Sequence, residues 1–300
     1  MATAISEYLG ATPVVRVVQL TRYSRQHQLS VPLLAGLMFD GATGSCADHV
    51  SEGILRLATA DGTLTPGMPV LEAGYGSFSL ALALACRRLG HPLTLVMPAS
   101  VEQERQQLLH SLGAAIVTTN PLYGREGQLQ LAHSLAQQQN GYFLDPFDNE
   151  YNVEFHKRMT GPALLRAVGS ELDMVVIGVG SAGTVTGVGE YLKAWAGNVR
   201  VVAVEPHECS VLSGGFAGRH SIPGLGAGFQ PGNYNPYIVD QIVRVPSAEA
   251  QRAAGQLLLY DGIPAGPASG AVACAALQLA LQPENAEKRI VALLPTRQDV

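Results

Sequence analysis

Lysine is the scarcest of the charged residues in this 300-residue sequence. Only three of the 19 basic side chains are lysines, namely Lys157, Lys193 and Lys288, so the first 156 residues contain none. Charged residues make up only 14% of the chain, and its basic residues form no cluster. Because nucleic acids and anionic membrane surfaces are bound through clustered positive charge, we expect neither as a partner.

Cysteine is also sparse, and its spacing excludes further classes. The four residues Cys46, Cys86, Cys209 and Cys274 lie far apart, without a CxxC pair or a histidine at metal-ligand spacing. We therefore expect neither a disulfide scaffold nor a metal site. No apolar run reaches the length of about 20 residues that spans a bilayer. The N-terminus lacks a basic stretch followed by an apolar core, so we expect no secretory signal and a cytoplasmic location.

The sequence is rich in alternating apolar segments. Short β-branched runs such as VVIGVG and IVALLP alternate with longer Ala- and Leu-rich stretches, and 47% of the chain is hydrophobic. This order predicts parallel sheets covered by helices, hence an α/β fold, and the length favours two domains. The expected strands are residues 31–37, 68–72, 92–97, 115–119, 174–178, 199–205, 241–245 and 289–294. The expected helices are residues 46–61, 77–89, 101–112, 124–140, 153–168, 184–196, 247–260 and 269–281.

One glycine-rich turn separates an expected strand from an expected helix. It comprises Gly180, Ser181, Ala182, Gly183 and Thr184. Backbone N–H groups of such a turn, together with the start of the helix, can converge on a phosphate. The turn matches neither a P-loop nor a GxGxxG motif, so a tight strand–helix connection without a ligand is an equal alternative from the pattern alone.

Several ordered segments resemble the cysteine synthase/cystathionine beta-synthase family of pyridoxal-phosphate (PLP) enzymes. GATPVVR at 10–16 is similar to the family's GNTPLVR, and TGSCADH at 43–49 is similar to TGSxKDR. Residues 180–184 resemble the family's phosphate loop GTGGT. Further matching segments are residues 72–80, 97–105, 147–162, 205–206, 224–229 and 239–240.

The resemblance implies a fold type II architecture, like that of the tryptophan synthase beta chain. It places a smaller mobile domain at residues 36–145, and a larger domain with the phosphate loop at residues 1–35 plus 146–300. It also implies PLP between the domains, a homodimer, and a cleft that can accept the tail of a partner protein.

The clearest departure from the family is Ala47, at the position of the lysine that forms the Schiff base. A methyl group can neither bind the aldehyde nor move protons. Three other positions differ as well. Ser77 replaces the asparagine that contacts the cofactor, Pro146 replaces a glutamine, and Ala268 replaces the serine that faces the pyridine nitrogen. Ser269, one residue further on, is retained as a candidate cofactor contact.

The segment that corresponds to the family's substrate-carboxylate loop is also changed. It reads Gly74, Tyr75, Gly76, Ser77, Phe78 where the family has hydroxyl donors. Near Ala47, the side chains of Cys46, Asp48 and His49 are weak catalytic candidates, because a helix start can lower a thiol pKa and histidine titrates near neutrality. Inert packing of the cysteine and a structural hydrogen bond of the histidine are the simpler interpretations.

Three hypotheses follow. The first is a pseudoenzyme that binds a phosphate-bearing or amino-acid ligand, or a partner protein, in the old cleft, with PLP bound without a covalent link if at all. The second is a PLP-dependent β-replacement or β-elimination enzyme acting on an O-activated serine, with Ala47 an introduced substitution. The third is a PLP-independent enzyme that uses Tyr75, Ser77 and the groups beside Ala47.

Overall fold

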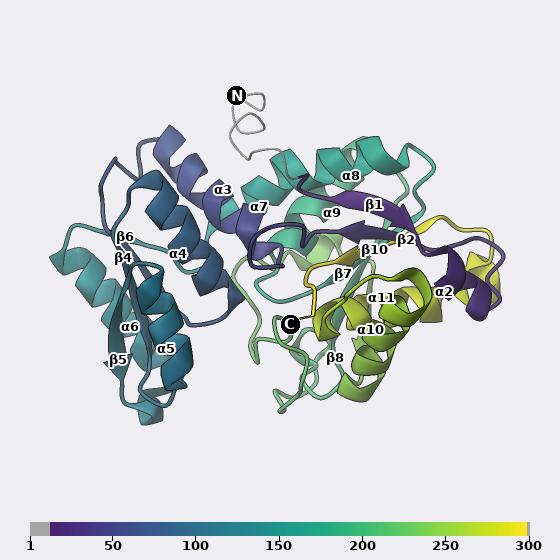
Figure 1. Ribbon diagram of the computed structural model, residues 1–300. Coiled ribbons are helices and arrows are strands. Elements are labelled where there is room, and N and C mark those ends of the chain that lie inside the picture. Colours follow the sequence, from purple (N-terminus) through teal and green to yellow (C-terminus); the bar gives the residue numbers. More distant parts are fainter. Residues whose placement is uncertain (1–12, 299–300) are drawn as a thin grey trace.

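The computed structural model describes residues 13–298, which fold into two units, each built on its own sheet (Figure 1). Gly10, Ala11 and Thr12 of the first matching segment lie outside the described residues. The larger sheet has six strands and the smaller has four. Every strand pair except one is parallel, which confirms the predicted α/β fold with two mostly parallel sheets.

The larger sheet has the strand order β1-β2-β10-β7-β8-β9. Its strands are β1 (Arg16–Gln19), β2 (Leu34–Leu37), β7 (Met174–Gly178), β8 (Arg200–Pro206), β9 (Gln241–Val245) and β10 (Ile290–Leu294). Helices α2 (Thr21–Gln26), α10 (Ser247–Asp261) and α11 (Pro267–Ala280) bury one face, and α8 (Gly161–Val168) and α9 (Gly183–Trp195) bury the other. The central strands are apolar throughout because both of their sides are covered.

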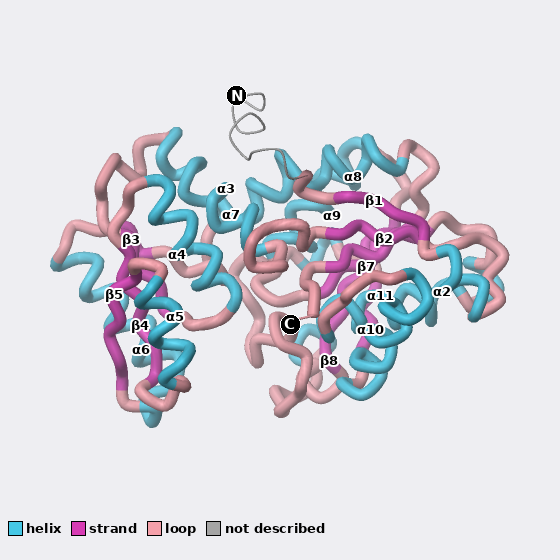
Figure 2. The backbone as a smooth tube through the Cα atoms, in the orientation of Figure 1, coloured by secondary structure: helices cyan, strands magenta, loops and turns pink. Residues whose placement is uncertain are grey.

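The smaller sheet has the order β5-β4-β3-β6 and its own core. Its strands are β3 (Val70–Ala73), β4 (Leu93–Pro98), β5 (Ala114–Thr119) and β6 (Tyr142–Phe143). Its helices are α3 (Ala47–Ala60), α4 (Ser77–Leu89), α5 (Gln103–Ser111) and α6 (Gly124–Gln138). Figure 2 shows this sheet standing apart from the larger one, with helices α3 and α4 and loops between them. The predicted domain boundary at residue 36 falls inside β2, which belongs to the larger sheet.

One predicted helix is divided in the structure. Residues 153–168 belong to α7 (Glu150–Phe155), a π-helical turn (His156–Thr160) and α8. Pro162 explains the wide turn, because proline has no N–H to donate and its ring would clash with the carbonyl four residues earlier in a regular helix. The turn places His156 beside α9. The short elements β1 and α2 were not predicted. No helix among residues 13–298 is long and apolar enough to cross a membrane.

Candidate functional site

The turn from β7 into α9 forms an anion cradle. Ala182 has a positive φ of 66° and precedes the first residue of the helix. The backbone N–H groups of residues 181–184 donate to no protein atom within the described chain, and Thr186 is the first to bond back, to the carbonyl of Ala182 at 3.0 Å. Four free donors at the start of a 13-residue helix match the oxygens of a phosphate group.

Two buried asparagines hold this loop in shape. The Asn152 Nδ2 donates to Ser181 Oγ at 3.0 Å and to the carbonyl of Pro146 at 2.7 Å. The Asn233 Nδ2 donates to that carbonyl at 2.8 Å and to the carbonyl of Ser181 at 3.3 Å. The backbone of Pro146 is therefore a structural acceptor next to the loop. The close packing extends to Gly183, where a Cβ would lie 1.9 Å from Asn152 Oδ1.

His156 supports the other end of the cradle. Its Nε2 lies 3.1 Å from Thr184 Oγ1 and its Nδ1 lies 2.9 Å from Thr160 Oγ1. Burial lowers the pKa of His156 to about 3, and the nearby His49 acts in the same direction. The imidazole is therefore neutral at physiological pH and orients Thr184, which leaves the backbone N–H groups to neutralise an anion.

The two positions that the family resemblance assigns to the cofactor ring carry methyl groups. Ala47 is the first residue of α3 and Ala268 lies in the first turn of α11, and both are buried. The hydroxyl of the neighbouring Ser269 is already engaged, because it donates to the Thr296 carbonyl at 2.6 Å and accepts from the Thr296 N–H at 3.0 Å. Ser77 is exposed at the start of α4.

The three weak candidates beside Ala47 have separate surroundings. Burial raises the pKa of Cys46 to about 11, so its thiol stays protonated at neutral pH. Both carboxylate oxygens of Asp48 accept from the Thr43 N–H, at 3.2 and 3.0 Å, and fix the preceding loop. Burial lowers the pKa of His49, whose Nε2 has no hydrogen-bond partner. Across residues 13–298, no hydrogen bond joins these three side chains to one another.

A buried acid, Glu72, lies next to the changed loop at residues 74–78, and the sequence pattern predicted no separate role for it. Burial raises the pKa of Glu72 to about 7, and Asp145 adds to the effect, while the hydrogen bond from Ser79 opposes it (2.8 Å). An acid within the apolar strand VLEA was the available signal. Tyr75 is 44% exposed, and its carbonyl accepts from Arg105 Nε at 2.8 Å.

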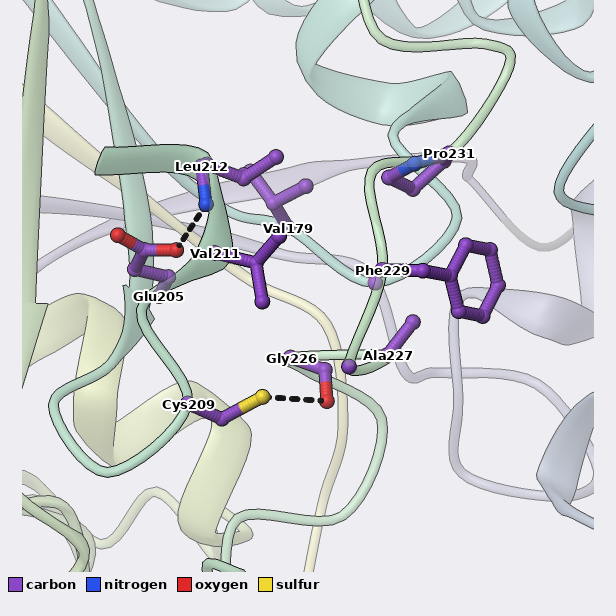
Figure 3. Close-up of a pocket in the computed structure, with 11 residues that line it drawn as sticks. Val179, Glu205, Cys209, Val211, Leu212, Gly226, Ala227, Phe229 and Pro231 are labelled. Atoms are coloured by element: carbon purple, nitrogen blue, oxygen red, sulfur yellow. Dashed lines mark hydrogen bonds between the residues drawn. The ribbon is translucent and has the colours of Figure 1, made fainter. Parts of the chain in front are cut away.

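A second missed group lies where the two units meet. Arg125, in the first turn of α6, donates from Nη2 to both carboxylate oxygens of Asp145, at 3.2 and 2.9 Å. Its guanidinium carbon lies 5.0 Å from the ring centre of Phe147 and 4.4 Å from that of Phe229. Figure 3 shows Phe229 on the loop that lines the pocket with Val179 and Gly226. No sequence pattern links residues so far apart in the chain.

PLP fits this arrangement at its phosphate end only. The cradle offers unpaired donors, whereas the ring end offers methyl groups and a serine already engaged by Thr296. All three lysines are in ion pairs elsewhere: Lys157 with Glu190, Lys193 with Asp240 and Lys288 with Asp173. Within the described chain, no group of three or more His, Cys, Asp or Glu side chains is arranged to hold a metal ion.

Comparison with known proteins agrees with this fold. The profile of the pyridoxal-phosphate dependent enzyme family matches residues 5–296, so the chain belongs to that family. Within the family it is similar to cysteine synthases. Cysteine synthase 3 of Caenorhabditis elegans is 36% identical over 285 residues, which are 94% of this chain and 83% of that protein.

Solved structures show the same similarity to cysteine synthases and related enzymes. The crystal structure of cysteine synthase from Entamoeba histolytica has a TM-score of 0.89 and 33% identity, over 98% of this chain and 87% of that one. A lysine-to-alanine variant of O-ureido-L-serine synthase, solved with O-ureido-L-serine bound, has a TM-score of 0.85 and 30% identity, over 96% of this chain and 89% of that one.

Proposed function

We propose that this chain is a cysteine synthase-family protein that has lost Schiff-base β-replacement chemistry and binds a phosphate-bearing ligand in the old cleft. PLP, when bound, supplies the electron sink for chemistry at an amino acid α-carbon. The residues around its ring no longer support that chemistry. Ala47 has no group that could hold the aldehyde or move a proton, and Ala268 has none that could accept a hydrogen bond from the ring nitrogen.

The observation that carries the proposal is the cradle itself. Four backbone N–H groups stay unpaired at residues 181–184, although buried or partly buried backbone groups are nearly always satisfied. Two asparagines and a neutral histidine hold the loop in this state. The relative solved with O-ureido-L-serine, itself a lysine-to-alanine variant, supports retention of amino-acid-type ligands by such a cleft. A homodimer and a partner protein in the cleft stay predictions from the family resemblance.

The first test compares the protein with an Ala47→Lys variant after incubation with PLP. We expect the Ala47 protein to bind PLP without a covalent adduct in the intact mass after borohydride reduction. The Ala47→Lys variant should gain both the adduct and absorbance at about 410 nm, typical of a lysine Schiff base. Turnover of an O-activated serine by the Ala47 protein would contradict the loss of β-replacement chemistry.

A second test addresses the cradle with inorganic phosphate as the probe. Ser181→Asp places a carboxylate beside the free N–H groups, and we expect it to weaken phosphate binding at least about tenfold by charge repulsion. Ser181→Ala is the matched control, because it keeps every backbone donor and, like the Asp variant, removes the hydroxyl that accepts from Asn152 Nδ2, so the difference in affinity between the two variants reports the charge alone. Calorimetry measures both. Equal affinities in the Asp and Ala variants would place the anion elsewhere.

A further inference from the structure

Arg125 lies where helix electrostatics disfavour a cation. The first turn of α6 carries the partial positive charge of the helix start, which favours acidic residues. The side chain is stabilised from outside its own helix, by Asp145 and by the faces of Phe147 and Phe229. These contacts orient the guanidinium rather than bury it, because 38% of the side chain stays exposed.

The guanidinium still has donors to offer. Arginine carries five N–H groups, and Asp145 accepts only from Nη2. The Nε and Nη1 atoms donate to no protein atom in the part of the chain that the structure describes. An incoming anion can therefore bind Arg125 without first displacing Asp145.

Arg125 also contacts a loop that lies next to the anion cradle. The guanidinium packs against the ring of Phe229, a residue that lines the same pocket as Gly180, which precedes the cradle. Arg125 belongs to the unit of the smaller sheet, whereas Gly180 and Phe229 belong to the unit of the larger one. A ligand that reaches from the cradle to Arg125 would thus contact both units.

The segments that resemble the family's carboxylate-binding groups offer little to an anion here. Gly74 and Tyr75 stand in place of hydroxyl donors, and Pro146 stands in place of a glutamine. Pro146 lies between Asp145 and Phe147, the two residues that orient Arg125. Arg125, which Asp145 and Phe147 orient beside Pro146, is a charged donor on this side of the cleft.

We propose that Arg125 selects ligands with a second anionic group, so that the ligand is a phosphate ester that also carries a carboxylate or another phosphate. The inference rests on the proposed phosphate binding at residues 181–184. The larger unit holds the phosphate, and Arg125 of the smaller unit holds the second anion through a charge-assisted hydrogen bond.

The test uses two compounds that differ in one carboxylate, O-phospho-L-serine and phosphoethanolamine. Calorimetry should show that the parent protein binds O-phospho-L-serine about tenfold more tightly than phosphoethanolamine. This is the difference in affinity expected for one charge-assisted contact. In Arg125→Gln the two compounds should bind equally, with phosphoethanolamine within about twofold of its affinity for the parent. Arg125→Lys keeps the charge and should retain part of the preference.

Arg158→Gln is the control, because Arg158 is an exposed arginine paired with Glu154 on its own helical segment. It should preserve the preference, and melting temperatures verify that every variant is folded. Equal binding of both compounds by the parent overturns the inference, as does an Arg125→Gln variant that weakens both alike. If the parent binds neither compound and no inorganic phosphate, the proposed function is overturned as well. Failure of the inference about Arg125 alone can therefore be distinguished from failure of the proposed phosphate binding.

Discussion

At the scale of single residues, the proposed site combines free backbone donors with methyl groups at residues 47 and 268. The free N–H groups of residues 181–184 belong to the backbone, so substitution of side chains does not remove them. The Schiff-base amine and the acceptor for the ring nitrogen are side chains, and Ala47 and Ala268 have neither. The backbone donors are thus present, whereas the side chains at residues 47 and 268 supply neither an amine nor a hydrogen-bond acceptor.

Glu72 gives a prediction about pH. Its pKa of about 7 in the folded chain exceeds that of an exposed glutamate, about 4.3, so the folded state binds more protons between these values. The contribution of Glu72 therefore lowers the free energy of unfolding as the pH rises from about 4.5 through 7, by an amount on the order of 3 kcal/mol. Glu72→Gln keeps the shape and removes this titration.

The measurement is urea unfolding of the parent and of Glu72→Gln at pH 5 and pH 8. We expect the difference in stability between Glu72→Gln and the parent to shift in favour of the variant from pH 5 to pH 8. At pH 8 the parent must ionise the buried carboxyl group of Glu72, and the variant has no such group at this position. Other titrating groups, including His156, are common to both proteins and cancel in the difference. Parallel pH profiles would show that Glu72 does not carry the shifted proton.

At the scale of elements, the cradle depends on how closely α9 approaches the segment that carries Asn152 and His156. A Cβ on Gly187 of α9 would lie 2.3 Å from the Val153 carbonyl oxygen and 2.9 Å from the Lys157 nitrogen. Both contacts are with backbone, which cannot turn aside as a side chain can. Glycine at this position lets the two segments pack, and so positions the partners of Ser181 and Thr184.

Gly187→Ala should therefore destabilise the protein by about 2–3 kcal/mol, as overpacking of a tight contact does. Gly255 in the middle of α10 provides the contrast, because a Cβ there meets nothing within 4 Å. Gly255→Ala should stabilise the protein by up to about 1 kcal/mol through helix propensity. Denaturant unfolding checks both. Similar effects from the two substitutions would argue against close packing at Gly187.

Most elements were predictable from the sequence. The strands 174–178 and 241–245 and the helix 77–89 have the bounds expected from their apolar patterns. The antiparallel edge strand β1 and the six-residue helix α2 were missed because short elements carry little periodicity. The π-helical turn was missed since residues 153–168 have a continuous helical pattern, and only Pro162 hints at a break.

At the scale of the whole molecule, the two sheets have separate cores, and the cradle belongs to one of them. Phosphate bound at residues 181–184 should protect the larger unit selectively, because a ligand opposes only those openings that disrupt its site. Hydrogen exchange should slow in β7 and α9 when inorganic phosphate is added, with little change in β4 and β5.

Potassium chloride at equal ionic strength is the control for nonspecific salt effects, and Ser181→Asp should abolish the protection. O-phospho-L-serine should extend the protection to α6, since Arg125 belongs to that helix. Equal protection of both sheets by inorganic phosphate alone would indicate that the two units open together rather than separately.

The sequence by itself determined the α/β class, the position of the glycine-rich anion loop, and the absence of a lysine at residue 47. These follow from local patterns, in which each residue is interpreted with its neighbours in the chain. The tertiary structure decided that the hydroxyl of Ser269 is used by Thr296, that Glu72 is buried, and that Arg125 lies against Asp145, Phe147 and Phe229. Burial and contacts between residues up to about a hundred positions apart depend on how the sheets pack, and no local pattern records them.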